Sequence, residues 1–200
     1  MEELIKNYKK AVDAISEEVL SNLKEKYDAD FEVKGYQLNI GELESILYIR
    51  KKTEGPLFLC KIKEQTISDD YIHVCMMQQL KDIINTAMLQ KGIPAVIDIQ
   101  TPNCNSFNQT EFVLLEDYLA TKGTLMISVC FEEGKGSAED IMKAIKYSIA
   151  KYGNKKLVAV YELSGENFLK LQEIKQKEIP VTYVDMNNAI PINKTVKVFE

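Results

Sequence analysis

The chain contains no tryptophan, one histidine and a single arginine, and these shortages exclude several functional classes. Arginine binds phosphates and guanine edges through two parallel hydrogen bonds, whereas lysine acts mainly as a point charge. Every basic residue except Arg50 is lysine, no lysine run is dense, and the formal net charge is -5. Because affinity for a duplex comes largely from neutralising phosphates, we expect no nucleic-acid partner.

The scarcity of histidine limits nucleophilic catalysis, since His73 is the one possible imidazole base of a triad or dyad. It is predicted in the first turn of a helix, where the positive helix dipole disfavours an imidazolium. The nearest thiol, Cys75, is two residues away, and residues two apart on a helix do not face each other. We therefore predict no catalytic residue of this kind.

The four cysteines, Cys60, Cys75, Cys104 and Cys130, form no C-x-x-C pair and no spacing suited to zinc. Three of them have apolar neighbours in the sequence, which is typical of free buried thiols. We predict free cysteines, no metal site and no cofactor. Free thiols favour a reducing compartment.

Long apolar runs are also missing, and none approaches the roughly 20 residues that a membrane span requires. The sequence starts Met1-Glu2-Glu3-Leu4, without a basic region followed by an apolar core. We therefore expect no membrane span, no signal peptide and a cytoplasmic location. An extracytoplasmic location is the alternative if the sequence derives from a lipid-anchored precursor.

The chain does contain the composition of a folded protein, with 46% hydrophobic and 28% charged residues. Apolar residues recur at helical spacing over residues 3–27 and predict an amphipathic helix. Strands are predicted at 31–33, 46–50 and 57–62, where short connections favour an antiparallel meander.

Helices and strands alternate in the remainder of the chain. Ser68 or Asp69 is a candidate N-cap for a helix that stops at Gly92, and Ser137 for one that stops at Gly153. Further helices are predicted over 112–120 and 166–178, and further strands over 95–99, 125–131, 157–161, 181–184 and 195–199. The predicted fold class is α+β (mixed α/β), an N-terminal helix followed by a mixed sheet with helices packed on it.

Two stretches of the sequence repeat one order of elements. A strand, a serine-capped helix, a glycine stop and a second strand occur at 57–99 and again at 125–161. One interpretation is a duplication that gives two similar β-α-β units; the other is that any α/β chain produces such echoes. We predict a single domain over 1–200, with two pseudo-repeated halves, about 31–100 and 112–200, as the alternative.

The segment between the predicted strand 125–131 and the following helix is a candidate binding loop. Glycines before a helix N-terminus can present N–H groups to a phosphate. The spacing matches neither a P-loop nor a dinucleotide motif, and two glutamates would repel a phosphate. A plain strand–helix connection is therefore the alternative. The candidate residues are Glu132, Glu133, Gly134, Gly136 and Ser137.

Carboxylates near the ends of predicted strands are the second group of candidates. Glu64, Asp98, Glu132 and Glu162 lie where α/β sheets gather their ligands, and a pair of them could serve acid–base chemistry or hold a divalent cation. Helix capping alone explains other acidic residues: Asp69, Asp70, Glu139 and Asp140.

The first half of the chain resembles a group of uncharacterised Firmicute proteins, some of them putative lipoproteins. The resemblance lies in Lys26-Tyr27 with Phe31-Glu32-Val33, a K-Y-x-x-x-F-E-V segment, and in the helix start Asp69-Asp70-Tyr71. It implies no activity. Relatives with lipid anchors would place the protein outside the cytoplasm, but this sequence has no lipobox.

No motif assigns an activity, so the leading interpretation is a non-catalytic binding or interaction protein with an unknown protein or small-molecule partner. The alternative is a small-molecule enzyme that uses strand-end carboxylates, with or without a divalent cation. A third interpretation is self-association into a homodimer through methionine and tyrosine side chains.

Overall fold

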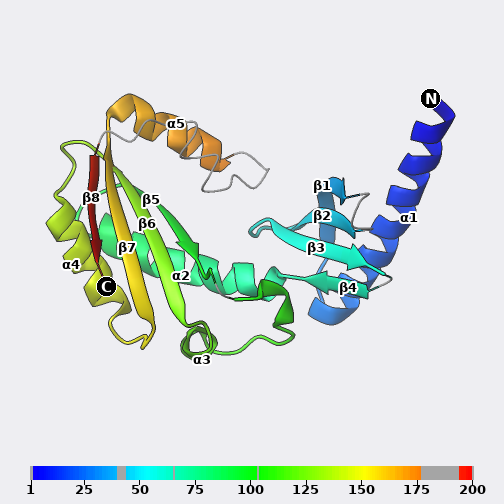
Figure 1. The fold of residues 1–200 in the computed structure, drawn as a ribbon, viewed down its shortest axis with the longest axis horizontal. Coiled ribbons are helices and arrows are strands. Elements are labelled where there is room, and N and C mark those ends of the chain that lie inside the picture. The colour runs from blue at the N-terminus through cyan, green and yellow to red at the C-terminus, as the bar shows by residue number, and fades with distance from the viewer. Residues whose placement is uncertain (1, 40–43, 65, 103, 177–193, 200) are drawn as a thin grey trace. The chain divides into compact units, whose positions relative to one another are not determined.

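Figure 1 shows the computed structural model, which describes residues 2–39, 44–64, 66–102, 104–176 and 194–199. Helices and two four-stranded sheets make up the fold, so the predicted α+β class is confirmed. None of the described helices is long and apolar enough to cross a bilayer.

The chain divides into two compact units, which we call the N-terminal unit and the C-terminal unit. The N-terminal unit comprises Met1–Cys75 with Ser106–Thr110, and the C-terminal unit comprises Met76–Asn105 with Glu111–Glu200. The boundary thus lies inside a helix, α2, Tyr71–Leu89. These units differ from the halves 31–100 and 112–200, and the single domain over 1–200 stays a prediction.

The N-terminal unit is helix α1, Glu2–Tyr27, followed by an antiparallel meander. The predicted helix and the antiparallel pairing are therefore present. The strands are β1 Phe31–Asn39, β2 Glu44–Lys51, β3 Phe58–Lys63 and β4 Thr66–Asp69. Apolar residues of α1, of alternate strand positions and of the start of α2 form its core: Val19, Leu23, Phe31, Leu47, Ile49, Phe58, Cys60 and Tyr71.

Strand β4 was not expected, because Ser68 and Asp69 were interpreted as helix caps. Glu64 adopts a positive φ of 50° in the turn after β3, and the chain then pairs back on that strand, Cys60 opposite Asp69. Helix α2 begins at Tyr71, and the Asp70 carbonyl accepts from the Val74 N–H in its first turn. The serine and aspartate pattern of a cap is compatible with the end of a short strand as well.

The C-terminal unit contains a mixed sheet in the order β5-β6-β7-β8. Its strands are β5 Ala95–Gln100, β6 Thr124–Glu132, β7 Lys155–Leu163 and β8 Lys194–Phe199. The central pair β6 and β7 is parallel, and each edge strand is antiparallel to its neighbour.

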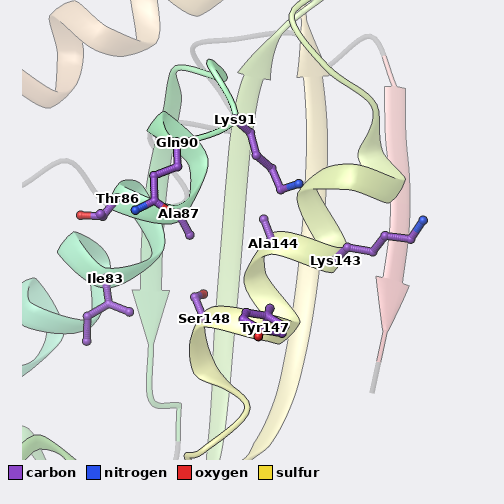
Figure 2. A pocket seen from close by; sticks show the side chains of 9 residues that line it. All are labelled: Ile83, Thr86, Ala87, Gln90, Lys91, Lys143, Ala144, Tyr147 and Ser148. Carbon is purple, nitrogen blue, oxygen red and sulfur yellow. The ribbon is translucent and has the colours of Figure 1, made fainter.

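Helices cover both faces of this sheet. Alternate residues of β6, among them Ile127 and Val129, are buried beneath α2 and α4, Ala138–Ile149, which lie on one face (Figure 2). On the other face, α5, Gly165–Gln176, packs Phe168 and Leu171 against Val96 and Cys130. The alternation of β6 therefore orients one face toward α2 and α4 and the other toward α5.

Of the two stretches that repeat one order of elements, only the second joins two strands of one sheet, β6 and β7 through α4. In the first stretch β3 and β5 belong to different sheets, which favours the interpretation that an α/β chain produces such echoes without a duplication. β3 pairs with β2 on one side and with β4 on the other. β5 pairs with β6, and α3 lies between these two strands in the sequence. The echo of sequence features is thus no repeat of structure.

The remaining expected elements agree in type but not always in length. Helix α3, Leu115–Ala120, is shorter than the expected 112–120, since Leu114 is extended with φ -63° and ψ 143°. A single 3-10 turn, η2 Ser106–Asn108, lies in the polar stretch after β5. The expected strand 181–184 lies outside the described residues.

Candidate functional site

The structure separates the eight residues that the sequence proposed as ligand contacts. Glu64 lies in the turn between β3 and β4 of the N-terminal unit, and the other seven lie in the C-terminal unit. Five of those seven form the connection from β6 to α4, which spans Glu132 to Ser137. That connection is the closest grouping among the expected candidates.

Both glycines of this connection and Ser137 have structural roles. Gly134 adopts a φ of 78°, a conformation that side chains disfavour. Gly136 passes so close to Ile93 that an added Cβ would lie 2.6 Å from its Cδ1 atom. The Ser137 hydroxyl accepts from the Asp140 N–H at 3.1 Å and so caps α4.

The start of α4 is also unfavourable for an anion. The Asp140 carboxylate accepts from the Ser137 hydroxyl at 2.7 Å, and Glu139 adds a second acidic side chain to the first turn. The Glu133 N–H is already donated to the Leu163 carbonyl at 2.7 Å. The geometry therefore favours the plain connection, and ligand binding by this segment stays a prediction.

The strand carboxylates of the C-terminal unit do not converge. Asp98 is paired in register with Ser128, four residues before Glu132, so both carboxylates project from the face that bears α5. Glu162 is opposite Phe131 and therefore lies on the other face. Within the described part of the chain, no three His, Cys, Asp or Glu side chains are grouped as metal ligands would be.

Asp98 instead takes part in local contacts. Its Oδ2 accepts from the Gln100 amide at 3.1 Å, and its Oδ1 lies 3.6 Å from the Lys81 ammonium. Both partners are ordinary surface-strand and helix residues of the same unit. This arrangement stabilises an edge strand more readily than it positions an acid–base pair.

A groove between α2 and α4 is a site that the sequence did not reveal. Figure 2 shows its lining residues along the two helices on one face of the sheet. Its volume is about 590 Å³. Pockets for ligands typically enclose roughly 300–1,000 Å³. The described residues that line it are Ile83, Thr86, Ala87, Gln90, Lys91, Lys143, Ala144, Tyr147 and Ser148.

The α2–α4 groove has a mixed lining of small, apolar and polar side chains, with two lysines among them. Ala87 and Ala144 contribute small side chains, and the described lining contains two lysines and no carboxylate. The side chain of Tyr147 is 91% exposed although it belongs to a helix whose other apolar residues are mostly buried. An exposed aromatic ring beside a groove is typical of a surface that contacts a partner.

A sequence signal for Tyr147 existed, but it was weak. The buried residues of α4 are Ile141, Met142, Ala144, Ile145 and Ile149, and Tyr147 lies off this stripe among lysines. An aromatic residue on the polar face of an amphipathic helix indicates a contact outside the core. The groove itself needs α2, which is remote in the sequence.

The N-terminal unit contains a buried acidic cluster built from Asp69 and Asp70, which are 5% and 7% exposed. Asp69 accepts from the Tyr27 hydroxyl at 2.7 Å, from the Lys26 ammonium at 2.8 Å and from the Tyr71 N–H at 3.2 Å. These bonds join the end of α1 to the start of α2.

Asp70 makes its hydrogen bonds with Leu59, and its pKa is raised. Its carboxylate accepts from the Leu59 N–H at 2.7 Å, while its own N–H donates to the Leu59 carbonyl. Burial raises the pKa of Asp70 to about 6, an effect that the neighbouring Asp69 reinforces and the Leu59 N–H opposes.

The thiols near this cluster are not activated nucleophiles. Burial raises the pKa of Cys60 to about 12, and the two aspartates add to the rise. The pKa of Cys75 is also raised by burial. Since the thiolate is the reactive form, the raised pKa values make both cysteines less reactive than an ordinary exposed thiol. All four cysteines are free, as predicted.

No protein-family model matches the sequence, and no curated protein matches it. The fold is similar to the crystal structure of a DUF5037 family protein from Ruminococcus gnavus, with a TM-score of 0.61. The two chains are 16% identical, and the match covers 88% of this chain and 86% of the other. At that identity the likeness shows the fold alone.

Proposed function

We propose that the protein is a non-catalytic binding protein whose partner occupies the α2–α4 groove. The observation that carries this proposal is the exposed ring of Tyr147 beside an open groove lined by Ala87 and Ala144. An aromatic side chain held on a rigid helix supplies a large contact area at low entropic cost.

The charge of the groove supports a protein partner with acidic side chains. Lys91 and Lys143 lie on its margin, while the chain as a whole has a formal net charge of -5. A cationic site on an acidic protein selects among partners by local complementarity. The scattered strand carboxylates give the alternative, a carboxylate enzyme, no comparable support.

A peptide selection tests the proposal. Random peptides displayed on phage are selected on the immobilised wild-type protein, and their affinities are measured by fluorescence anisotropy. We expect Tyr147→Ala to weaken the selected peptides at least about tenfold, as the loss of a hot-spot residue does.

Leu169→Ala is the matched control, because Leu169 is an exposed apolar residue on another helix of the same unit. The control variant should bind as the wild type does. Peptides that bind both variants equally well, or a selection that yields no peptide, would contradict the proposal.

The cellular setting is part of the same proposal. Free cysteines are typical of a reducing compartment, which supports the cytoplasm. The resemblance of the first half to Firmicute lipoprotein-like proteins supports the alternative location outside the cytoplasm. Fractionation of the host cell with an antibody to this chain distinguishes the two.

A further inference from the structure

The C-terminal unit has a second exposed surface, which is apolar and has acidic residues on both sides. Three consecutive apolar residues before α3 are exposed: Phe112 by 52%, Val113 by 41% and Leu114 by 73%. Single exposed apolar residues are ordinary, but three in succession form a patch that needs an explanation. We call residues 111–117 the acidic–apolar segment.

The charge of this segment is opposite to that of the groove. Glu111, Glu116 and Asp117 flank the apolar triplet and are exposed, and the segment contains no lysine. Leu114 has an extended backbone and directly precedes α3. Exposed apolar side chains with acidic residues on both sides complement a groove that contains apolar side chains and two lysines.

We propose that the partner in the α2–α4 groove is a second copy of this chain, which inserts its acidic–apolar segment. This inference rests on the proposed function of the groove. The segment and the groove belong to the same compact unit, so every copy carries both at a fixed spacing. Two copies related by a two-fold axis then form both contacts at once, which closes the assembly as a dimer.

The two lysines of the groove are available for this contact. Lys143 lies 2.9 Å from the Glu139 carboxylate, but both side chains are exposed. Surface pairs of this kind contribute little to stability, so the Lys143 ammonium can turn toward an acidic side chain of a partner. Lys91 follows the last turn of α2 and is exposed.

Exchange of charges tests the dimer directly by sedimentation velocity. In the groove variant, Lys91→Glu with Lys143→Glu, the margin becomes acidic; in the segment variant, Glu116→Lys with Asp117→Lys, the segment becomes basic. We expect the wild type to be dimeric at submillimolar concentration. Each variant alone should raise the dimer dissociation constant about 100-fold or more, because like charges then meet at both contacts.

An equimolar mixture of the two variants should restore the dimer. In the mixed pair an acidic segment meets a lysine groove and a basic segment meets a glutamate groove, so both contacts are again complementary. Lys52→Glu with Lys63→Glu is the matched control for the groove variant, because it makes the same change in net charge at exposed positions of the N-terminal unit. This control should dimerise as the wild type does.

Circular dichroism and the thermal midpoint establish that each variant is folded. If the segment variant does not fold, Leu114→Ser replaces it, since this exposed side chain contributes to the contact and not to the core. Leu114→Ser should also dissociate the dimer.

A wild type that stays monomeric at every concentration overturns the inference, as does a dimer that the charge reversals leave intact. The peptide selection tests the proposed function separately from the dimer. Peptides that need Tyr147 on a monomeric wild type would preserve the groove as a binding site and remove only the second copy as its partner.

Discussion

The two units of this protein use their polar side chains in opposite ways. In the N-terminal unit, Asp69 and Asp70 are buried among aromatic rings; they are the two charged residues that the described part of the chain buries. In the C-terminal unit the conspicuous groups, Tyr147 and the groove lysines, lie at the surface. Buried polar groups stabilise and orient a fold, whereas exposed groups beside a groove are free to act on a partner.

The two units should therefore differ in the property that a substitution changes, which is either stability or partner binding. In the N-terminal unit a substitution in the acidic cluster should change stability. In the C-terminal unit the groove residues should change binding and leave stability nearly constant. Four substitutions test this division, in order of decreasing effect on the free energy of unfolding.

Asp69→Ala should give the largest loss, about 2–4 kcal/mol of unfolding free energy, because it leaves three donors without their acceptor. The figure is below that of a fully buried ion pair, since Lys26 is partly exposed. Urea denaturation measures the loss. Asp30→Ala is the control: it removes an exposed pair with Lys24 and should have a much smaller effect on stability.

Asp70→Asn should change how stability depends on pH. The folded state raises the pKa of Asp70 from 3.8 to about 6, so it holds the proton more tightly than the unfolded chain does. Stability from this group is therefore present below pH 4 and is lost as the pH rises to about 6, by about 2–3 kcal/mol. Denaturation midpoints between these pH values measure the slope.

The asparagine variant should lack that slope and be more stable than the wild type at pH 7. Its carbonyl oxygen can still accept from the Leu59 N–H, so the variant removes the charge and keeps the bond. Equal pH dependence in the two proteins would show that Asp70 is not the titrating group.

Gly136→Ala should cost about 1–3 kcal/mol, because the new methyl group would meet the buried Ile93 side chain. Ile93→Val removes the Cδ1 atom nearest to it, so the double variant should be more stable than the sum of the single effects. A thermal-denaturation cycle measures the coupling. Gly134→Ala is the control: it is strained by its positive φ, and Ile93→Val should not rescue it.

Tyr147→Ala should have the smallest effect on stability, within about 0.5 kcal/mol, because the ring is almost fully exposed. Tyr152→Ala is the contrast, since this ring is buried in the same unit and its loss should cost about 3–5 kcal/mol. Chemical denaturation compares the two. A large loss for Tyr147→Ala would place the ring in the core and contradict its role as a binding residue.

Much of the fold was predictable because local signals agree with one another. Periodicity over 3–27 predicted α1, and the serine cap with two acidic residues predicted the start of α4 at Ala138. Gly92 follows the end of α2 and has a φ of 72°, as is typical of a glycine that terminates a helix. Strand β4 was missed because its four residues resemble a cap as closely as a strand.

The candidate site was less predictable, because it depends on contacts between residues far apart in the chain. The strand-end carboxylates were one hypothesis for a site, but the register places Asp98 and Glu162 on opposite faces and Glu64 belongs to another unit. Conversely, Lys91 and Tyr147 gave no joint signal, although both line one groove.

The sequence by itself determined the fold class, the types of most elements, the free thiols and the lack of a recognised catalytic motif, since these follow from composition and from patterns within a few residues. Only the tertiary structure decided which strands share a sheet, that the acidic pair is buried, and that α2 and α4 form a groove. Strand pairing and burial are free energies of contact between distant segments, and no local pattern along a chain contains them.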